Sequence, residues 1–452
     1  MLLQKNEMYE TEITGMTAEG NGVCRIDGFA VFVPMTAIGD KLKIKIVKVL
    51  KNYAFGILHE LLTPGAGRVD PDCPVFRQCG GCTFRHVDYS TELRYKSGFV
   101  QDTFDRIGKL HPVFEPILGS PETFHYRNKA QYPVAMQNGK LVCGFYAKHS
   151  HRIIPYTACS LHPEIFREIL EYLLPVLQKA YVSAYDEQAH TGELRHIYLR
   201  KGYHSGEIML CFVTRVSIRK KLNFLPALKE KFPEVISICE SVNPAKTNVI
   251  MGKNVTVLAG QNFITDTMCG NQIRISPQSF YQVNTAQAEK LYAIAKQYAD
   301  FQGNELLLDL YCGAGTIGLS MADSVKKLIG VEIIPQAVEN ARENARRSQI
   351  TNAEFYCGDV GMITQKLAEQ SLHPDVVILD PPRKGCDNIT IQSVVNMQPD
   401  KIIMVSCNPA TCARDSAIFA KNNYITKKVK AVDLFPNTAH CECVLLLSRQ
   451  KD

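Results

Sequence analysis

The chain of 452 residues is long enough for two to four domains, and its 46% hydrophobic and 21% charged residues are ordinary for a soluble globular protein. It contains no run of about 18 apolar residues that would predict a membrane span, and its first residues lack the apolar core of a signal peptide. We therefore expect a cytoplasmic protein whose 16 cysteines stay reduced, which favours metal binding or catalysis over disulfide bonds. The net charge of +6 permits a nucleic-acid partner without requiring one.

Short alternating runs separated by glycines occupy roughly the first 60 residues, and Lys41–Ile46 places its lysines on one face. Five such runs predict a small closed β-barrel of the oligonucleotide-binding kind: Tyr9–Ile13, Gly22–Ile26, Phe29–Val33, Lys41–Val49 and Ala54–Leu58. These runs fit equally well a β-module with a solvated basic face. The turn Gly20–Gly22 and the segment Phe32–Pro34 resemble the TRAM domain, a small RNA-binding barrel, and this resemblance favours RNA.

Three cysteines lie within ten residues after a short linker: Cys73, Cys79 and Cys82. The last two form a CxxC around two glycines, which lets the backbone wrap until both thiolates reach one ion or cluster. Of the candidates for a fourth ligand, Cys159 lies in a polar turn, whereas Cys143 lies in a strand-like run that indicates packing. The spacing predicts a metal site but does not separate tetrahedral zinc from an iron–sulfur cluster.

The stretch up to about residue 265 predicts a central α/β domain. Helices are expected over Thr91–Ile107, Pro163–Gln178 and Ile218–Phe232, and strands over Arg195–Arg200, Glu207–Val213 and Val249–Leu258. The segment Tyr126–Tyr132 mixes basic, amide and aromatic residues, which suits phosphate contacts with base stacking or a strand with a charged outer face. The segment His196–Arg200 is also basic, although its basic residues can equally be ordinary surface.

The last third alternates strands and helices, and this pattern predicts a doubly wound α/β sheet. A buried strand over Glu305–Leu310 precedes a GxGxxG formed by Gly313, Gly315 and Gly318, directly before a helix. That context is the one a nucleotide-binding loop requires. Glu332 ends the second strand, where an acidic residue hydrogen-bonds ribose hydroxyls.

Functional side chains also follow the next three strands. Asp359 follows the third strand, Asp380 ends the fourth before Pro-Pro-Arg, and Cys407 follows the fifth strand over Lys401–Val405. The glycine loop alone is shared by dinucleotide dehydrogenases and S-adenosylmethionine methyltransferases, whereas the Asp-Pro-Pro turn and Asp359 favour methyl transfer. Taken alone, Cys407 would more often be a packed thiol.

Five motifs together resemble the RNA uracil-5-methyltransferase family: Phe280–Asn284, Asp309–Gly315, Asp380–Arg383, Ser406–Pro409 and Asp433–Glu442. The resemblance extends over nearly the whole chain, and the barrel and the cysteine cluster place it nearest the 23S rRNA (uracil-5-)-methyltransferase branch. It implies a TRAM-like barrel over residues 1–62, a central α/β iron–sulfur domain over 63–265 and a class I methyltransferase domain over 266–452.

The resemblance also implies residue roles. Cys407 is the expected nucleophile that adds to carbon 6 of uracil, and Glu442 is the expected general base that removes the proton from carbon 5. S-adenosylmethionine is the expected methyl donor, and its expected contacts are Gln282, Tyr311, Gly313, Gly315, Thr316, Glu332, Asp359 and Asp380.

The resemblance assigns the metal site as a 4Fe-4S cluster with four ligands: Cys73, Cys79, Cys82 and Cys159. Because methyl transfer moves no electron, we expect this cluster to be structural or to position RNA. The remaining cysteines of the last domain are expected to pack: Cys312, Cys357, Cys386, Cys412, Cys441 and Cys443.

Three alternatives stay open from the sequence. The substrate could be transfer RNA rather than ribosomal RNA. An RNA cytosine-5-methyltransferase uses the same thiolate addition but ordinarily has Pro or Thr where this chain has Ser406. A non-catalytic RNA-binding iron–sulfur protein is the third, and the intact Cys407 and Glu442 argue against it. We expect RNA as the partner, no membrane, a monomer, and a target base flipped out of its stack.

Overall fold

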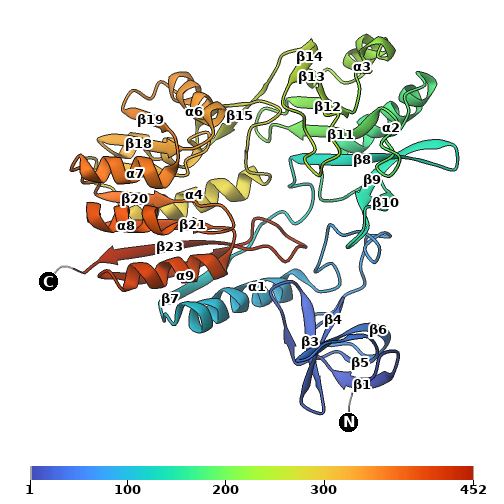
Figure 1. Cartoon of the computed structure of the whole chain (residues 1–452), viewed down its shortest axis with the longest axis horizontal. Helices are drawn as coiled ribbons and strands as arrows, with labels where there is room; N and C mark the ends of the chain where they lie inside the picture. Colours follow the sequence, from blue (N-terminus) through green and yellow to red (C-terminus); the bar gives the residue numbers. More distant parts are fainter. Residues whose placement is uncertain (1–2, 451–452) are drawn as a thin grey trace.

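Six strands near the N-terminus form one sheet in the order β1-β5-β6-β4-β3-β2 in the computed structural model, which describes residues 3–450 (Figure 1). Leu42, Ile44 and Ile46 point into its core while the intervening lysines point outward, as the alternation predicts. The five expected strands are present, and a sixth short strand adds to them. The bounds are β1 Met8–Glu12, β2 Gly15–Met16, β3 Asn21–Ile26, β4 Phe29–Pro34, β5 Lys41–Val49 and β6 Tyr53–Thr63.

A seven-stranded sheet forms the middle of the molecule, in the order β10-β9-β8-β11-β12-β13-β14. Helices α2 and α3 accompany it, and the hairpin β15–β16 follows it in the chain. The bounds are β8 Lys129–Gln137, β9 Lys140–Tyr146, β10 Ile153–Pro155, α2 Glu164–Lys179, β11 Leu194–Lys201, β12 Ile208–Thr214, α3 Leu225–Lys231, β13 Val235–Val242, β14 Val255–Gly260, β15 Ile264–Met268 and β16 Asn271–Ile275.

Two expected elements of this region were wrong in extent. The helix over Ile218–Phe232 is a short 3-10 turn followed by α3, because a proline stands in the first turn of α3, where it favours a helix start. The strand over Val249–Leu258 begins only at Val255. Before it, the amide of Asn243 donates to the carbonyls of Val249 and Ile250, at 2.7 and 3.2 Å, and holds that stretch as a loop.

The two basic segments are more buried than the sequence suggested. Tyr126 and Tyr132 are 3% and 0% exposed, so their rings are not available for base stacking. Arg200 is fully buried, and its guanidinium donates to the carbonyls of Ser279 and Tyr281 at 2.7 and 3.3 Å. The interpretation of these positions as surface or stacking residues was therefore wrong. Arg200 instead ties the middle sheet to the segment before α4.

The third sheet has eight strands in the order β19-β18-β17-β20-β21-β23-β22-β7, with β17 to β21 parallel and β23 antiparallel to β21. Successive residues of β17 pack on opposite faces, since Leu307 lies in one apolar core and Leu308 in the other. Helices cover both faces in Figure 1, which confirms the doubly wound prediction. The strand bounds are β17 Leu306–Leu310, β18 Lys327–Glu332, β19 Ala353–Cys357, β20 Val376–Leu379, β21 Lys401–Ser406, β22 Tyr424–Val432 and β23 Glu442–Arg449.

The helices of this third body are α4 Thr285–Ala299, α5 Thr316–Leu319, α6 Pro335–Arg347, α7 Val360–Glu369, α8 Asn388–Met397 and α9 Pro409–Ala420. Its last strand, β7 (Val113–Leu118), comes from much earlier in the chain and pairs in parallel with β22. The preceding helix α1 (Tyr89–Thr103), which continues as a π-helix to Gly108, also contacts α9 and β22. Within residues 3–450, no helix is both long and apolar enough to cross a bilayer.

Candidate active site

Cys407 and Glu442 come together through the register of two antiparallel strands. Ser406 at the end of β21 pairs with Cys443 on β23, so one further step along this register places Cys407 opposite Glu442. The Cys443 thiol also donates to the carbonyl of Ser406 at 3.6 Å. Glu442 is 6% exposed and Cys407 is partly buried. A thiol and a carboxyl group from distant parts of the sequence therefore lie side by side at the carboxyl edge of the parallel strands.

Burial and the repulsion between neighbouring acidic groups favour the protonated forms of the side chains at this edge. Burial raises the pKa of Glu442 to about 8, the neighbouring Asp380 carboxylate adds to the rise, and the Arg383 guanidinium opposes it. Burial likewise raises the pKa of Asp380 to about 7. The pKa of Cys407 is raised to about 11 by burial and by Glu442 and Asp380, while Arg383 again lowers it. Negative charge is disfavoured at this site until a cation or substrate changes the balance.

The glycine loop after β17 turns sharply at the same edge. Tyr311 has a φ of +63°, and its hydroxyl donates to Thr390 Oγ1 at 3.3 Å. Gly315 has a φ of +79°, and a Cβ atom there would come within 3.2 Å of side chains that include Ala341 and Phe355. The positive φ of Gly315 and the lack of room for a Cβ atom there explain why the turn needs glycine next to the short helix α5.

The two acidic residues after β18 and β19 already organise backbone amides. Glu332 accepts hydrogen bonds from the amides of Gly313 and Ile334, at 3.1 and 2.8 Å, and so links the glycine loop to its own strand end. Asp359 is exposed and caps helix α7 by accepting from the amide of Met362 at 3.0 Å. Both lie at the carboxyl edge where the sequence placed them.

Tyr292 on α4 lies next to three of the residues expected to contact the methyl donor. Its buried hydroxyl is hydrogen-bonded to Thr316 Oγ1 at 3.2 Å, interacts with the Gln282 side chain and lies near Asp380. The carbonyl of Gln282 accepts from the Asn128 amide at 2.9 Å, which fixes the segment before α4. Nothing in the sequence singled out Tyr292, because a tyrosine at a core position of a helix has no pattern of its own.

Arg383 and Asn408 are functional candidates to which the sequence reasoning gave no role. The Asn408 amide donates to the carbonyl of Arg383 at 2.9 Å, so the turn after β20 is tied to the turn after β21. Asn408 Oδ1 also caps α9 by accepting from the amide of Ala410 at 3.1 Å. The signal for this role was present, because an asparagine before a proline is a common helix start. Arg383 is the cation that acts on both Cys407 and Glu442.

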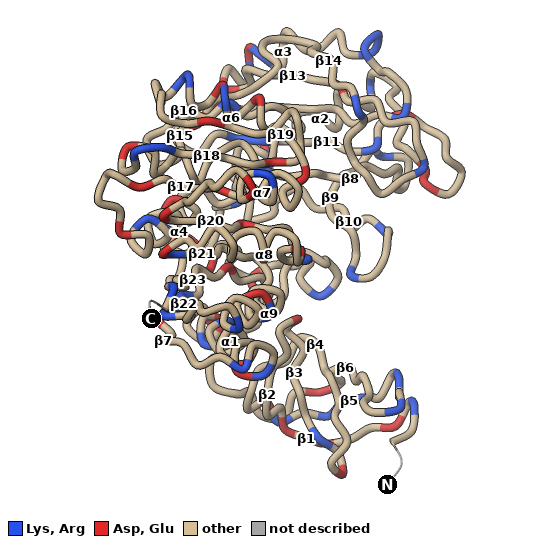
Figure 2. The backbone as a smooth tube through the Cα atoms, turned by 60° about the vertical axis from the view of Figure 1, so that its left-hand side comes forward, with Lys and Arg blue, Asp and Glu red and all other residues tan. Residues whose placement is uncertain are grey.

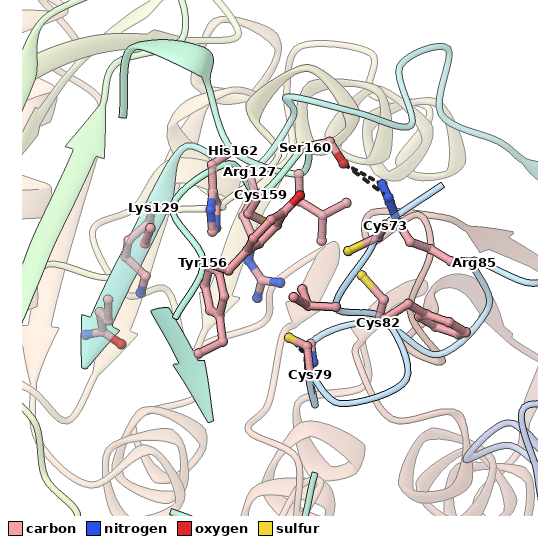
Figure 3. Close-up of a pocket in the computed structure, with 17 residues that line it drawn as sticks. Cys73, Cys79, Cys82, Arg85, Arg127, Lys129, Tyr156, Cys159, Ser160 and His162 are labelled. Carbon is pink, nitrogen blue, oxygen red and sulfur yellow. Dashed lines mark hydrogen bonds between the residues drawn. The ribbon is translucent and has the colours of Figure 1, made fainter. Parts of the chain in front are cut away.

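A second group of thiols lines a pocket of about 260 Å³ between the cysteine-rich segment and the middle sheet (Figure 3). Cys79 is anchored by a β-bridge to Ala147, and its sulfur accepts the amide of Gly81 at 3.3 Å. Cys143 is buried in the core of the middle sheet and does not line this pocket. The four thiols that line it are those of Cys73, Cys79, Cys82 and Cys159.

The charges around this pocket differ from those at Cys407. Arg85, Arg127 and Lys129 line it, and Tyr156 lies between the thiols and Lys129 in Figure 3. Burial raises the pKa of Cys82 to about 12, and the Arg85 guanidinium opposes the rise. Among residues 3–450, no three His, Cys, Asp or Glu side chains converge closely enough to hold one metal ion.

Most of the cysteines expected to pack do so, with one correction. Cys357 is exposed at the end of β19, so its expected burial was wrong. It is the last residue of the edge strand β19, which is paired on one side only, with β18. The buried members of this group are Cys312, Cys386, Cys412, Cys441 and Cys443.

The barrel carries an aromatic face beside a lysine. Phe55 on β6 pairs with Phe32 on β4 and with Lys48 on β5, so these side chains form a row across three strands. The rings of Phe32, Tyr53 and Phe55 lie 5.4 to 5.9 Å apart, and Tyr53 is 37% exposed. Figure 2 shows further lysine and arginine positions around this barrel.

Comparison with known proteins agrees with this architecture. The tRNA (Uracil-5-)-methyltransferase family matches residues 88–450, and the TRAM domain matches residues 3–59. An uncharacterized RNA methyltransferase of Oceanobacillus iheyensis is 42% identical over 449 residues, covering 99% of this chain and 97% of the relative. One from Clostridium tetani is 40% identical over 451 residues, covering 100% of this chain and 98% of the relative.

A solved structure is similar over almost the same length. It is the Pyrococcus abyssi tRNA (uracil-54, C5)-methyltransferase in complex with S-adenosyl-L-homocysteine, which is 26% identical, with a TM-score of 0.77 over 97% of this chain and 100% of that one. The family match begins after the cysteine-rich segment of Cys73, Cys79 and Cys82, and it includes the whole eight-stranded sheet, β7 among its strands. The chain belongs to the tRNA (uracil-5-)-methyltransferase family and carries a TRAM domain at its N-terminal end.

Proposed function

We propose that this protein transfers a methyl group from S-adenosylmethionine to carbon 5 of a uracil in RNA. The observation that carries the proposal is the strand register that sets Cys407 beside Glu442. The reaction needs a nucleophile and a base on one small ring, and this pair of side chains supplies both. The family to which the chain belongs supports the same reaction.

The proposed chemistry follows from the two side chains. The Cys407 thiolate adds to carbon 6, and the electrons of the carbon 5–carbon 6 double bond make carbon 5 nucleophilic. Carbon 5 then takes the methyl group as its bond to the donor's sulfonium breaks, which releases S-adenosylhomocysteine. Glu442 removes the proton from carbon 5, the double bond re-forms, and the Cys407 thiolate is expelled. Arg383 favours the thiolate form of Cys407.

The acidic edge suits a cationic methyl donor. Burial raises the pKa of Asp309 to about 8, with Asp380 and Glu332 adding to the rise and the amide of Gly318 opposing it. The sulfonium and ammonium groups of S-adenosylmethionine would relieve this repulsion. The proposed contacts are Gln282, Tyr311, Gly313, Gly315, Thr316, Glu332, Asp359 and Asp380, and the P. abyssi relative was solved with the demethylated product of this donor.

We also propose a 4Fe-4S cluster in the cysteine pocket. Four thiols line this one pocket, two of them from a CxxC, and four thiolates are the ligand set of such a cluster. When bound, the cluster would cross-link the segment of Cys73, Cys79 and Cys82 to the turn that holds Cys159. The proposed ligands are Cys73, Cys79, Cys82 and Cys159.

The aromatic face of the barrel supports RNA as the substrate, since exposed rings beside lysines stack bases and neutralise phosphates. For the specific RNA, the resemblance of barrel and cysteine cluster favours 23S rRNA, and we propose it as the target. The structural similarity to a tRNA (uracil-54, C5)-methyltransferase favours the second candidate, transfer RNA.

The test is methylation of separated ribosomal and transfer RNA with labelled S-adenosylmethionine, followed by mapping of the modified nucleotide. We expect 5-methyluridine in 23S rRNA. Label in transfer RNA alone would replace the proposed substrate and keep the chemistry. Label on cytosine, or no labelled nucleotide in either RNA, would overturn the proposed reaction.

A further inference from the structure

Lys96 is a lysine with no exposed surface, and two carboxylates share it. Its Nζ donates to Glu92 Oε1 at 2.6 Å, one turn earlier on α1, and to Asp433 Oδ1 at 2.7 Å. It also donates to the carbonyl of Phe435 at 3.1 Å. All three of its donors are therefore used, and two of the acceptors lie more than 330 positions away in the sequence. Lys96 therefore links α1 to a segment that lies far away in the sequence.

Asp433 opens the loop that leads into Glu442. This 433–441 loop connects β22 to β23, and Glu442 is the first residue of β23. Asp433 Oδ2 also accepts from the Tyr89 hydroxyl at 2.8 Å, and its Oδ1 accepts from the amide of Phe435 at 3.1 Å. The start of the loop is thus clamped to α1 by both oxygens of one carboxylate.

The rest of the loop has no regular secondary structure and is held by hydrogen bonds from several segments, among them Tyr126 to the carbonyl of Pro436 at 2.9 Å and Asn284 to the carbonyl of Leu434 at 3.1 Å. The carbonyl of Asn437 accepts the amides of Thr83 and Phe84, at 2.8 and 3.1 Å, and Asn437 has a φ of +68°. The amide of Asn437 donates to Glu92 Oε1 at 2.8 Å, so the oxygen that binds Lys96 also binds the loop a second time. Lys96 and Glu92 therefore fix the loop at Asp433, Phe435 and Asn437.

We propose that Lys96 is a positioning residue for Glu442, which sets the 433–441 loop so that the carboxyl group reaches the proton on carbon 5. This inference rests on the proposed function. Glu442 is held by the loop on one side and, on the other, by its own pairing with Val432 and the pairing of Cys443 with Ser406. Lys96 acts only on the first of these, and it does not touch Cys407. Its loss should impair proton removal and leave thiol addition and methyl transfer in place.

The readout is the covalent intermediate, because a misplaced base stops the reaction after the methyl group has been transferred. We expect Lys96→Met to lower turnover by about 10²-fold, the effect of a small misplacement of a reacting group. We also expect it to accumulate a protein–RNA adduct that survives denaturation and carries the labelled methyl group, with little change in KM for RNA. Lys96→Arg, which keeps the charge, should restore part of the turnover and reduce the adduct.

Two further variants guard against a general loss of structure. Tyr89→Phe removes the hydrogen bond to Asp433 and the one from the amide of Ser120 without unbalancing a buried charge, and it should give a smaller change in the same direction. Arg449→Met breaks an ion pair with Asp400 (2.8 Å) at the other end of β23, and it should accumulate no adduct. Lower turnover of Lys96→Met and Tyr89→Phe without adduct, or wild-type turnover in both, would overturn the inference. Failure of Glu442→Gln to accumulate adduct would instead count against the proposed function.

Discussion

The two thiol sites of this protein are built in opposite ways. Cys407 stands alone at the end of a sheet strand, with Glu442 and Asp380 raising its pKa. The other site has four thiols on loops, with arginine and lysine side chains in its wall. An acidic surrounding keeps a thiol protonated until a substrate or cation arrives, whereas several thiols near cations favour a bound, multiply charged group. This difference is the one expected if, as proposed, Cys407 reacts with the substrate and the four other thiols bind a cluster.

The largest effect is expected from Cys407→Ala. Without the nucleophile carbon 5 is not activated, and we expect a loss of turnover of at least about 10⁴-fold. Iron content should stay at the wild-type level, because Cys407 is not in the cysteine pocket. The measurement is labelled-methyl incorporation beside iron analysis of the same sample. Retained methylation would contradict the role of Cys407, and lost iron would contradict the separation of the two sites.

Glu442→Gln should block the proposed reaction at a later step than Cys407→Ala does. We expect turnover to fall about 10²- to 10⁴-fold, the usual contribution of a general base, while the methylated adduct with Cys407 accumulates. Denaturing electrophoresis with labelled methyl donor measures the adduct, and Glu339→Gln, on the exposed face of α6, is the matched control. If Glu442→Gln lost turnover with no adduct, the carboxyl group would act before methyl transfer.

Cys159→Ser should disrupt the proposed cluster site in the cysteine pocket and leave the Cys407 site intact. We expect bound iron to be lost and the thermal midpoint to fall, because one of four ligands is replaced by a weaker donor. Cys143→Ser is the matched control, since Cys143 is buried in the neighbouring core and does not line the pocket. It should lower stability while iron remains. If Cys159→Ser kept its iron and Cys143→Ser lost it, Cys143 and not Cys159 would be the fourth ligand.

The contrast between the sites also shows what the sequence could predict. The ends of the strands could be predicted, because a short apolar run followed by Gly, Asp or Cys indicates both a buried strand and the edge at which it ends. Cys407 and Asp380 were therefore placed correctly at the carboxyl edge of the sheet. The pairing of Cys407 with Glu442 depends on strand register, which the motifs do not encode. Lys96 was missed because a lysine in an amphipathic helix predicts solvent, and its burial is decided by Asp433 in a distant loop.

The last expected effect concerns stability, and it tests whether Glu442 is protonated beside Cys407. Glu442 has its pKa raised from 4.5 to about 8 by burial, so between these pH values the folded state holds a proton that the unfolded state has lost. The free energy of unfolding of the wild type should therefore fall as pH rises through this window, by about 1.4 kcal/mol for each pH unit at most. Glu442→Gln lacks this proton, so its stability relative to the wild type should rise from pH 5 to pH 8 and then level off. Urea denaturation at pH 5, 6.5 and 8 measures the difference, and Glu339→Gln should show none. A Glu442→Gln difference that stays constant with pH would mean that the carboxyl group is ionised in the folded protein and that burial does not hold its proton.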